Sequence, residues 1–346
     1  MTKPFIIDGV CHPYNFAPEN LNGRFGRIFN DVMNSYHPVV NPTFLDKPKW
    51  ERDWQPDEFM ETMLLESDTD MCCVHSTPIF DAYYDGLVSN AKGKYLKDKY
   101  PDRVIWYGAV DLFEDPKKAL KVAEEQIDAG CDGIKLYPSR YVAGFTEHWR
   151  MDSREIAFPL FELCQNKGIT NVAVHKVLPI GPVSSDGMNV DDISAAANNF
   201  TDLNFQIVHA GFMFVDETKM LIGNHPNVYV TMEASLLFCI LDPAEQARLL
   251  TEFMRFGGPQ KIIYASAAVN PHPQVVIDAF AKFTMPDGNP FQLTEDVRAM
   301  ILGGNLAGLH GIDIAAQRNK IENDSFAQEK AANGLRTAWA SIGEAA

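Results

Sequence analysis

Histidine is scarce in this sequence of 346 residues, yet it recurs where short apolar runs end. Four of the nine histidines stand at such positions, namely His12, His75, His175 and His209. Imidazole nitrogens that converge from several strands suit Zn²⁺, Fe²⁺ or Mn²⁺, with carboxylates completing the ligand set. We predict that His12, His175 and His209 form the centre of a site. His75 is explained equally well by loop hydrogen bonding, because two hydroxyl residues follow it.

Charged residues stand beside other apolar runs. Asp8 precedes His12 and is either a metal ligand or an acceptor for loop amides. Glu233 follows Thr-Met after a run, and we predict that it acts in catalysis together with His209. Lys135, in Gly-Ile-Lys-Leu-Tyr-Pro, and Arg140 are predicted to bind the carboxylate of a substrate. A lysine that only extends its charged end to solvent is the structural alternative for Lys135.

The elements that must position these residues alternate along the whole chain. Short, almost continuously apolar runs predict parallel strands that are covered on both faces. They are residues 5–7, 71–74, 104–110, 133–136, 171–174, 205–208, 228–231 and 262–264. Helical stretches lie between them; one begins at Asp115-Pro116 and ends before Gly130. The alternation predicts a (β/α)₈ TIM barrel, whose catalytic groups lie at the carboxyl ends of the strands. The alternative is a doubly wound sheet, but Asp8-Gly-Val-Cys-His12 is no glycine-rich phosphate loop.

Two segments interrupt this alternation. Residues 13–56 form a long aromatic insertion after the first strand, which we predict to be a lid or a subunit contact. Residues 314–346 form a polar, alanine-rich tail that we predict to be helical and to dock on the barrel or on a partner. The predicted barrel domain spans residues 1–313. Of the five other histidines, in predicted loops or helices, only His272 follows a barrel strand closely enough to approach the site.

Composition narrows the functional classes. A net charge of −16 disfavours nucleic acid and anionic membrane surfaces, because both require basic patches. The six cysteines are scattered and predict reduced thiols. No run is long enough for a membrane span, and the chain enters a strand without a signal peptide. We expect a cytoplasmic protein.

Together these motifs resemble the amidohydrolase superfamily, in its amidohydrolase-related branch, which includes aminocarboxymuconate-semialdehyde decarboxylase. The resemblance covers about residues 4–313. It depends on Ile-Asp-x-x-x-His at 7–12, on the lysine motif at 133–138 and on histidines after the fifth and sixth strands. It also depends on Ile-Leu-Gly-Gly-Asn at 301–305, followed by Leu-His-Gly-Ile-Asp at 309–313. The resemblance implies a divalent metal, either Zn or Fe/Mn. The predicted ligands are Asp8, His12, His175 and His209, and His209 would also orient or deprotonate a water.

Two positions depart from the family pattern. The first ligand of the strand-1 pair falls on Val10, and the aspartate that ends the eighth strand falls on Ala267. The usual zinc site and its hydrolytic base are therefore in doubt. Asp8, Glu233 or His272 could replace the lost ligands in a rearranged site.

Three functions remain open. The first is a metal-dependent hydrolase or decarboxylase that acts on a small carboxylate. The second is a subunit of a non-haem Fe/Mn hydroxylase (a monooxygenase), similar to the amidohydrolase-like subunits of aminoisobutyrate hydroxylase. The third is a non-catalytic partner of a related enzyme. We expect a homo-oligomer, or a hetero-oligomer with a related amidohydrolase-like subunit.

Overall fold

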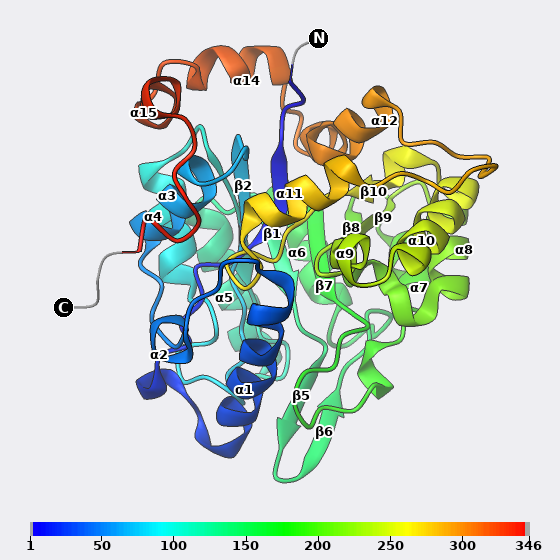
Figure 1. Cartoon of the computed structure of the whole chain (residues 1–346). Helices are drawn as coiled ribbons and strands as arrows, with labels where there is room; N and C mark the ends of the chain where they lie inside the picture. Colours follow the sequence, from blue (N-terminus) through cyan, green and yellow to red (C-terminus); the bar gives the residue numbers. More distant parts are fainter. Residues whose placement is uncertain (1–2, 343–346) are drawn as a thin grey trace.

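The computed structural model describes residues 3–342, and in this range eight parallel strands form a barrel inside a layer of helices (Figure 1). Neighbouring strands pair in the order β1-β2-β3-β4-β7-β8-β9-β10. Their bounds are β1 Ile7–Cys11, β2 Met71–His75, β3 Val104–Ala109, β4 Gly133–Leu136, β7 Asn171–His175, β8 Asn204–Val208, β9 Val228–Thr231 and β10 Ile262–Ile263. The two ends of this order meet where the amide of Gly9 donates to the carbonyl of Tyr264 (3.0 Å). The predicted TIM barrel is confirmed.

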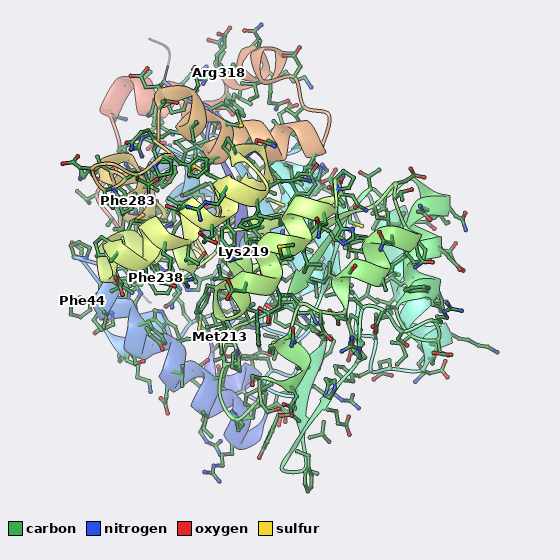
Figure 2. All side chains as sticks on the ribbon, turned by 90° about the vertical axis from the view of Figure 1, so that its right-hand side faces the viewer. Phe44, Met213, Lys219, Phe238, Phe283 and Arg318 are labelled. Carbon is green, nitrogen blue, oxygen red and sulfur yellow. The ribbon has the colours of Figure 1, made fainter. Side chains whose placement is uncertain are left out.

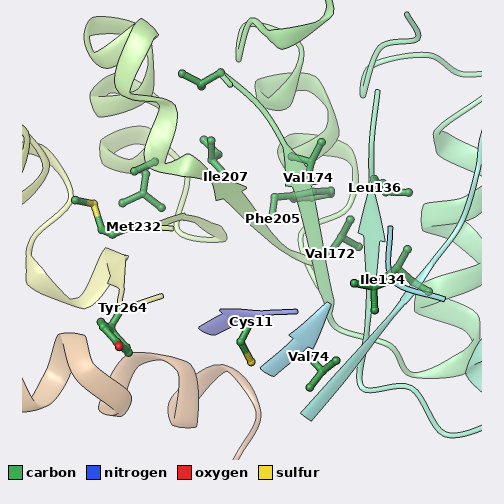
Figure 3. Close-up of a cluster of buried hydrophobic side chains, with 14 of the residues drawn as sticks. Cys11, Val74, Ile134, Leu136, Val172, Val174, Phe205, Ile207, Met232 and Tyr264 are labelled. Atoms are coloured by element: carbon green, nitrogen blue, oxygen red, sulfur yellow. The ribbon is translucent and has the colours of Figure 1, made fainter. Parts of the chain in front are cut away.

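Glycine is needed at this closure. A Cβ on Gly9 would lie 2.6 Å from the carbonyl oxygen of Tyr264, which is too close for any side chain. Between strands and helices lies the main apolar core, built from outward-facing residues of successive strands (Figure 3). Val74, Val174 and Ile207 are examples, and all three are completely buried. Burial on both faces explains why the strands are almost uniformly apolar in sequence.

The helices follow the strands and begin at recognisable caps. At α5, Asp115 accepts hydrogen bonds from the amides of Lys117 and Lys118, and Pro116 takes the first helical position. The helices that surround the barrel are α3 Pro56–Leu65, α4 Asn90–Lys99, α5 Pro116–Asp128, α6 Phe158–Lys167, α7 Ile193–Asn199, α8 Val215–Asn224, α9 Phe238–Leu241, α10 Pro243–Phe256, α11 Pro273–Lys282, α12 Glu295–Ala299 and α13 Asn305–Leu309.

Additional elements lie at both ends of the barrel (Figure 1). The insertion contains α1 Gly23–Val40 and α2 Lys47–Trp50; α1 lies at the end toward which the strands run. The hairpin of β5 Ser139–Val142 and β6 Phe145–His148 extends at the same end. The tail helices α14 Ile314–Ile321 and α15 Ser325–Asn333 lie at the opposite end.

The hairpin was absent from our prediction, and His148 lies on its strand β6 rather than in a loop or helix. Its turn has left-handed backbone at both central residues, with φ of 51° at Ala143 and 93° at Gly144. Turns of this hand match the twist of paired strands, so the dipeptide Ala-Gly closes a tight hairpin. Because an alanine takes the first turn position, where Asn, Asp or Gly is usual, the sequence signal is weak.

Within the described residues, no single helix is long and apolar enough to cross a membrane. Only the segment Glu295–Leu309 taken together with Ile314–Ile321, bent by 96°, has the length and composition of a span.

Candidate active site

His12 follows β1 and is anchored to backbone groups. Its amide donates to the carbonyl of Ala268 (2.6 Å), and its ring Nδ1 lies 2.9 Å from the carbonyl oxygen of His75. A carbonyl oxygen can only accept, so Nδ1 carries the proton and, in the neutral ring, Nε2 keeps a lone pair. That nitrogen faces Glu233, whose Oε1 lies 3.4 Å away. His12 therefore presents Nε2 to Glu233 and the site.

His175 and His209 form a linked pair. Nε2 of His175 donates to the carbonyl of Leu178 (2.8 Å), so Nδ1 of the neutral ring is an acceptor. Nε2 of His209 lies 3.0 Å from this Nδ1 and donates to it. The other nitrogen of His209, Nδ1, has no hydrogen-bond partner among the described residues and lies 3.6 Å from Oε2 of Glu233. The carboxylate of Glu233 thus stands between the imidazoles of His12 and His209.

Left-handed backbone recurs in the loops that carry these groups. The φ angle is 68° at His209 and 55° at Ala210, directly after β8. It is 56° at Ala234, next to Glu233, and 62° at Ala267, after β10. Each such residue costs about 1–3 kcal/mol, and such strain is concentrated at functional sites. Three neighbouring loops of the barrel are therefore strained at the point where the imidazoles and the carboxylate meet.

Burial sets the charge of the site. It lowers the pKa of His209 to about 4 and the pKa of His175 well below its ordinary value. Burial also lowers the pKa of Lys135 to about 8. Burial by itself would raise the pKa of Glu233, but His209, His12 and Lys135 outweigh it and hold that pKa below its usual range. Near pH 7 the site therefore contains neutral His175 and His209 beside a charged carboxylate.

A cavity of about 290 Å³ lies against this cluster. Its polar lining includes His175, His209 and Glu233, together with Asp81, Ser139 and Asn270. Most of the remaining wall is apolar: one side comes from α1, with Phe25, Phe29, Val32, Met33, Tyr36 and Val40, and another from the segment after β9, with Leu237, Phe238 and Leu241. The face that carries Phe238 also exposes Met213 and Phe44 (Figure 2). The insertion thus closes one side of the cavity.

The other predicted site residues lie outside the cavity wall. Asp8 is fully buried, and its Oδ1 accepts from the amides of Ser266 (3.0 Å) and Val10 (3.3 Å). Burial raises the pKa of Asp8 to about 7. Lys135 is also fully buried, with Nζ 5.2 Å from the ring centroid of Tyr137. The structure therefore places both charges in the barrel interior.

Arg140 lies on the β5–β6 hairpin, where its Nη2 is 2.7 Å from Oε2 of Glu147. It does not line the cavity.

Two tyrosines in the site escaped our prediction. Tyr14 stacks on His12 with ring centroids 4.8 Å apart, and Tyr137 stacks on His175 at 4.5 Å. Both line the cavity. Each carries a sequence signal in hindsight, because Tyr14 follows His12 by two residues and Tyr137 belongs to the lysine motif. Stacking holds the imidazoles in plane and shields them from solvent.

A divalent transition metal needs several nitrogen or oxygen donor atoms that converge on one point. In residues 3–342 no three His, Cys, Asp or Glu side chains already converge in the geometry of metal ligands. The donor types nevertheless suit a cation: His12 and His175 each use one ring nitrogen on a backbone carbonyl, and the other nitrogen of His12 faces Glu233 while that of His175 contacts His209. Metal-binding histidines are held in this way. Val10, where the family has a ligand, is buried in the apolar core of the barrel.

Comparison with known proteins supports this fold. Residues 95–309 match the family model described as amidohydrolase, which is more than half of the chain. The chain therefore belongs to the amidohydrolase family of enzymes. No curated protein matches it.

Solved structures share the fold at low sequence identity. An uncharacterised TIM-barrel protein from Bordetella bronchiseptica superposes with a TM-score of 0.66 at 19% identity, covering 91% of this chain and 99% of that one. The 5-carboxyvanillate decarboxylase of Sphingomonas paucimobilis has a TM-score of 0.54 at 15% identity, covering 90% and 100%. A dihydroxybenzoic acid decarboxylase from Polaromonas, with bound manganese and the inhibitor 2-nitroresorcinol, has a TM-score of 0.55 at 12% identity, covering 92% and 99%.

Proposed function

We propose that this protein is a metal-dependent decarboxylase or hydrolase that acts on a small aromatic carboxylate. The observation that carries the proposal is the cavity, because most of its wall is apolar and His175, His209 and Glu233 stand together in that wall. Two of the structures with this fold are decarboxylases whose names specify aromatic acids. A volume of about 290 Å³ suits one substituted ring and excludes polymers.

Substrate orientation follows from this distribution of groups. The ring would lie against the side chains of α1, and the carboxylate would point toward His175, His209 and Glu233. Near Glu233 a second anion needs a positive charge, and Lys135 is a buried cation whose charge acts on Glu233. We assign to Lys135 the role of attracting the substrate carboxylate through its positive potential. Arg140, paired with Glu147 on the hairpin, is a weaker candidate for this role.

Proton transfer is assigned to His209. In decarboxylation the bond between the ring carbon and the carboxylate breaks, CO₂ leaves, and the ring carbon keeps the electron pair and takes up a proton. In hydrolysis a water must lose a proton instead. Nδ1 of His209 has no hydrogen-bond partner among the described residues, and His209 lines the cavity, so the neutral ring can take a proton from water there and, once protonated, can deliver that proton to the ring carbon. Glu233, 3.6 Å away, would stabilise the protonated ring.

His12 and His175 would hold a divalent metal ion (Zn, or Fe/Mn), which when bound supplies a Lewis acid beside the cavity. Asp8 and His209, the other predicted ligands, stay predictions. Asp8 is the weaker of the two, because its Oδ1 already accepts from two amides.

Purified protein should first be examined by elemental analysis and then assayed with a panel of mono- and dihydroxybenzoates, followed by loss of ultraviolet absorbance and release of CO₂. We expect about one equivalent of transition metal and turnover of at least one aromatic acid, while aliphatic acids of equal charge are poor substrates. Absence of metal, with no turnover after addition of Mn²⁺ or Zn²⁺, would overturn the proposal. Co-purification of a related chain in that case would favour a partner-subunit role.

A further inference from the structure

Asn270 lies on the loop between β10 and α11, where this loop meets the end of α1 (Figure 1). It is 6% exposed, and every polar atom of its side chain is used. Its Nδ2 donates to the carbonyl of Met33 (3.2 Å), and its Oδ1 accepts from Nε1 of Trp50 (3.1 Å). Its backbone carbonyl accepts from Nδ1 of His37 (2.7 Å) and from Nδ2 of Asn41 (3.0 Å). One residue of the barrel therefore bonds to four residues of the insertion.

The sequence of α1 explains why these bonds gather at one place. Met33, His37 and Asn41 follow one another at intervals of four residues, so they share a face at the carboxyl-terminal end of the helix. Asn41 also accepts, through Oδ1, from the amide of His272 (2.7 Å), which lies two residues after Asn270. The end of α1 is therefore joined to the β10–α11 loop through both side chains and backbone.

The same helix forms one wall of the cavity, and Asn270 itself belongs to the lining. The cavity-lining residues of α1 are Phe25, Phe29, Val32, Met33, Tyr36 and Val40. Contacts between an apolar wall and a bound ring weaken steeply when the two move apart. The fit of a ligand in this cavity therefore depends on the position of α1, and the bonds to Asn270 fix that position at one end.

We propose that Asn270 is a positioning residue, which fixes the end of α1 against the barrel and thereby sets the size of the acid that the cavity admits. This inference rests on the proposed function, because it takes the cavity as the site of an aromatic acid. Without the side chain of Asn270, the carbonyl of Met33 and the indole nitrogen of Trp50 lose a partner in a buried place. The end of α1 then moves toward water, which satisfies these groups and draws the wall away from the ring.

Hydrogen–deuterium exchange tests the hold on α1 without any substrate. We expect Asn270→Ala to speed exchange of the amides in residues 33–41 by about tenfold or more, because local opening becomes easier. The matched control is Asn227→Ala. Asn227 is also 6% exposed and donates to three backbone carbonyls, but it directly precedes β9 and does not line the cavity. Its replacement should leave exchange in α1 unchanged.

Ligand binding tests the effect on size. Calorimetry would compare 2-hydroxybenzoate with the larger 3-hydroxy-2-naphthoate on the wild type and on each variant. We expect Asn270→Ala to weaken binding of the benzoate by about fivefold and to shift the preference between the two acids toward the naphthoate by about fivefold or more. Asn227→Ala should keep the wild-type preference, which a general loss of stability would not alter.

A milder variant keeps the test decisive if Asn270→Ala does not fold. Trp50→Phe removes only the indole donor to Oδ1 of Asn270 and keeps an aromatic ring, so we expect the same shifts at smaller size. Thermal unfolding of each variant verifies folding.

Unchanged exchange in α1, or an unchanged preference between the two acids, in a folded Asn270→Ala variant would overturn the inference. Equal changes in Asn270→Ala and Asn227→Ala would overturn it as well. Faster exchange confined to α1, in a protein that binds neither acid, would support the hold of Asn270 on α1 and overturn the proposed substrate.

Discussion

Two buried histidine–glutamate clusters lie in this molecule, and they are built in opposite ways. Glu66, on the loop after α3, accepts from Nε2 of His272 (2.9 Å) and from the amides of Trp339 and Ser341 (2.6 Å each). His272 in turn accepts from the amide of Gln274. The carboxylate of Glu66 and both ring nitrogens of His272 therefore have hydrogen-bond partners. These bonds hold the C-terminal segment against the barrel.

The cluster around Glu233 has the same residue types with the opposite pattern. Its carboxylate accepts no short hydrogen bond, Nδ1 of His209 has no partner among the described residues, and the adjoining backbone is left-handed. Satisfied buried polar groups stabilise a fold, whereas unsatisfied ones cost stability and persist where another constraint keeps them. The difference agrees with a structural role for Glu66 and with the catalytic role that we propose for Glu233.

Glu233→Gln is the sharpest test of this difference. We expect turnover to fall by about 1000-fold, because the site loses the carboxylate that faces His12 and His209 while its shape is kept. The free energy of unfolding should change by less than about 1 kcal/mol, since a poorly partnered charge is removed. Steady-state kinetics and urea denaturation measure the two effects. Normal turnover would assign the chemistry to another group.

Glu66→Ala should have the reverse outcome. Removing this carboxylate leaves His272 and two amides without acceptors, so we expect a loss of about 3 kcal/mol in unfolding free energy. The control is Glu61→Ala, which removes the partly exposed partner of Arg336 and should cost less than about 1 kcal/mol. Equal losses in the two variants would contradict the structural role of Glu66.

The contribution of Glu66 to stability should also depend on pH. Burial opposes ionisation, but the bonds from His272 and Ser341 outweigh it and lower the pKa of Glu66 below its ordinary value of 4.5. Its stabilising contribution is therefore present above about pH 4.5 and is lost as pH falls through the folded-state pKa. Between pH 5 and 3 we expect the unfolding free energy of Glu66→Gln to fall less steeply than that of the wild type, by up to about 1.4 kcal/mol per pH unit. Parallel slopes would show that Glu66 does not titrate in this range.

The buried lysines Lys135 and Lys176 differ in their partners, and replacing each by methionine tests that difference. Nζ of Lys135 has no hydrogen-bond partner among the described residues, whereas that of Lys176 lies 2.9 Å from Asp192. We expect Lys135→Met to raise stability by about 1 kcal/mol and to raise KM for the aromatic acid about fivefold. Lys176→Met should instead destabilise, because it strands a buried carboxylate. An unchanged KM in Lys135→Met would remove Lys135 from substrate binding.

Arg140→Ala should have the smallest effect. Its partner Glu147 is half exposed, so the pair contributes about 0.5 kcal/mol or less to stability. KM should stay within about twofold of the wild type. A larger increase in KM would support the sequence-based prediction that Arg140 binds the substrate.

Much of the barrel and part of the site were predictable from sequence. The predicted runs fall on the observed strands within a few residues, because strands buried on both faces must be apolar along their length. His12, His175 and His209 were predicted as one centre, and the structure brings them together around Glu233. The β5–β6 hairpin was missed because its strands are short and largely exposed, so they carry no alternation of buried and exposed residues.

The sequence by itself determined the barrel, the histidines at its strand ends and the absence of carboxylates from positions 10 and 267. These features are local, since they depend on periodicity and on residue type at a given place in the chain. Only the tertiary structure decided which nitrogens carry lone pairs and which glutamate faces them. Ring protons are placed by carbonyls distant in the chain, such as that of His75 for His12, and composition contains no record of that pairing. The same limit separates Glu66 from Glu233: both are glutamates near histidines, and only their hydrogen-bond partners distinguish a structural clamp from a candidate active site.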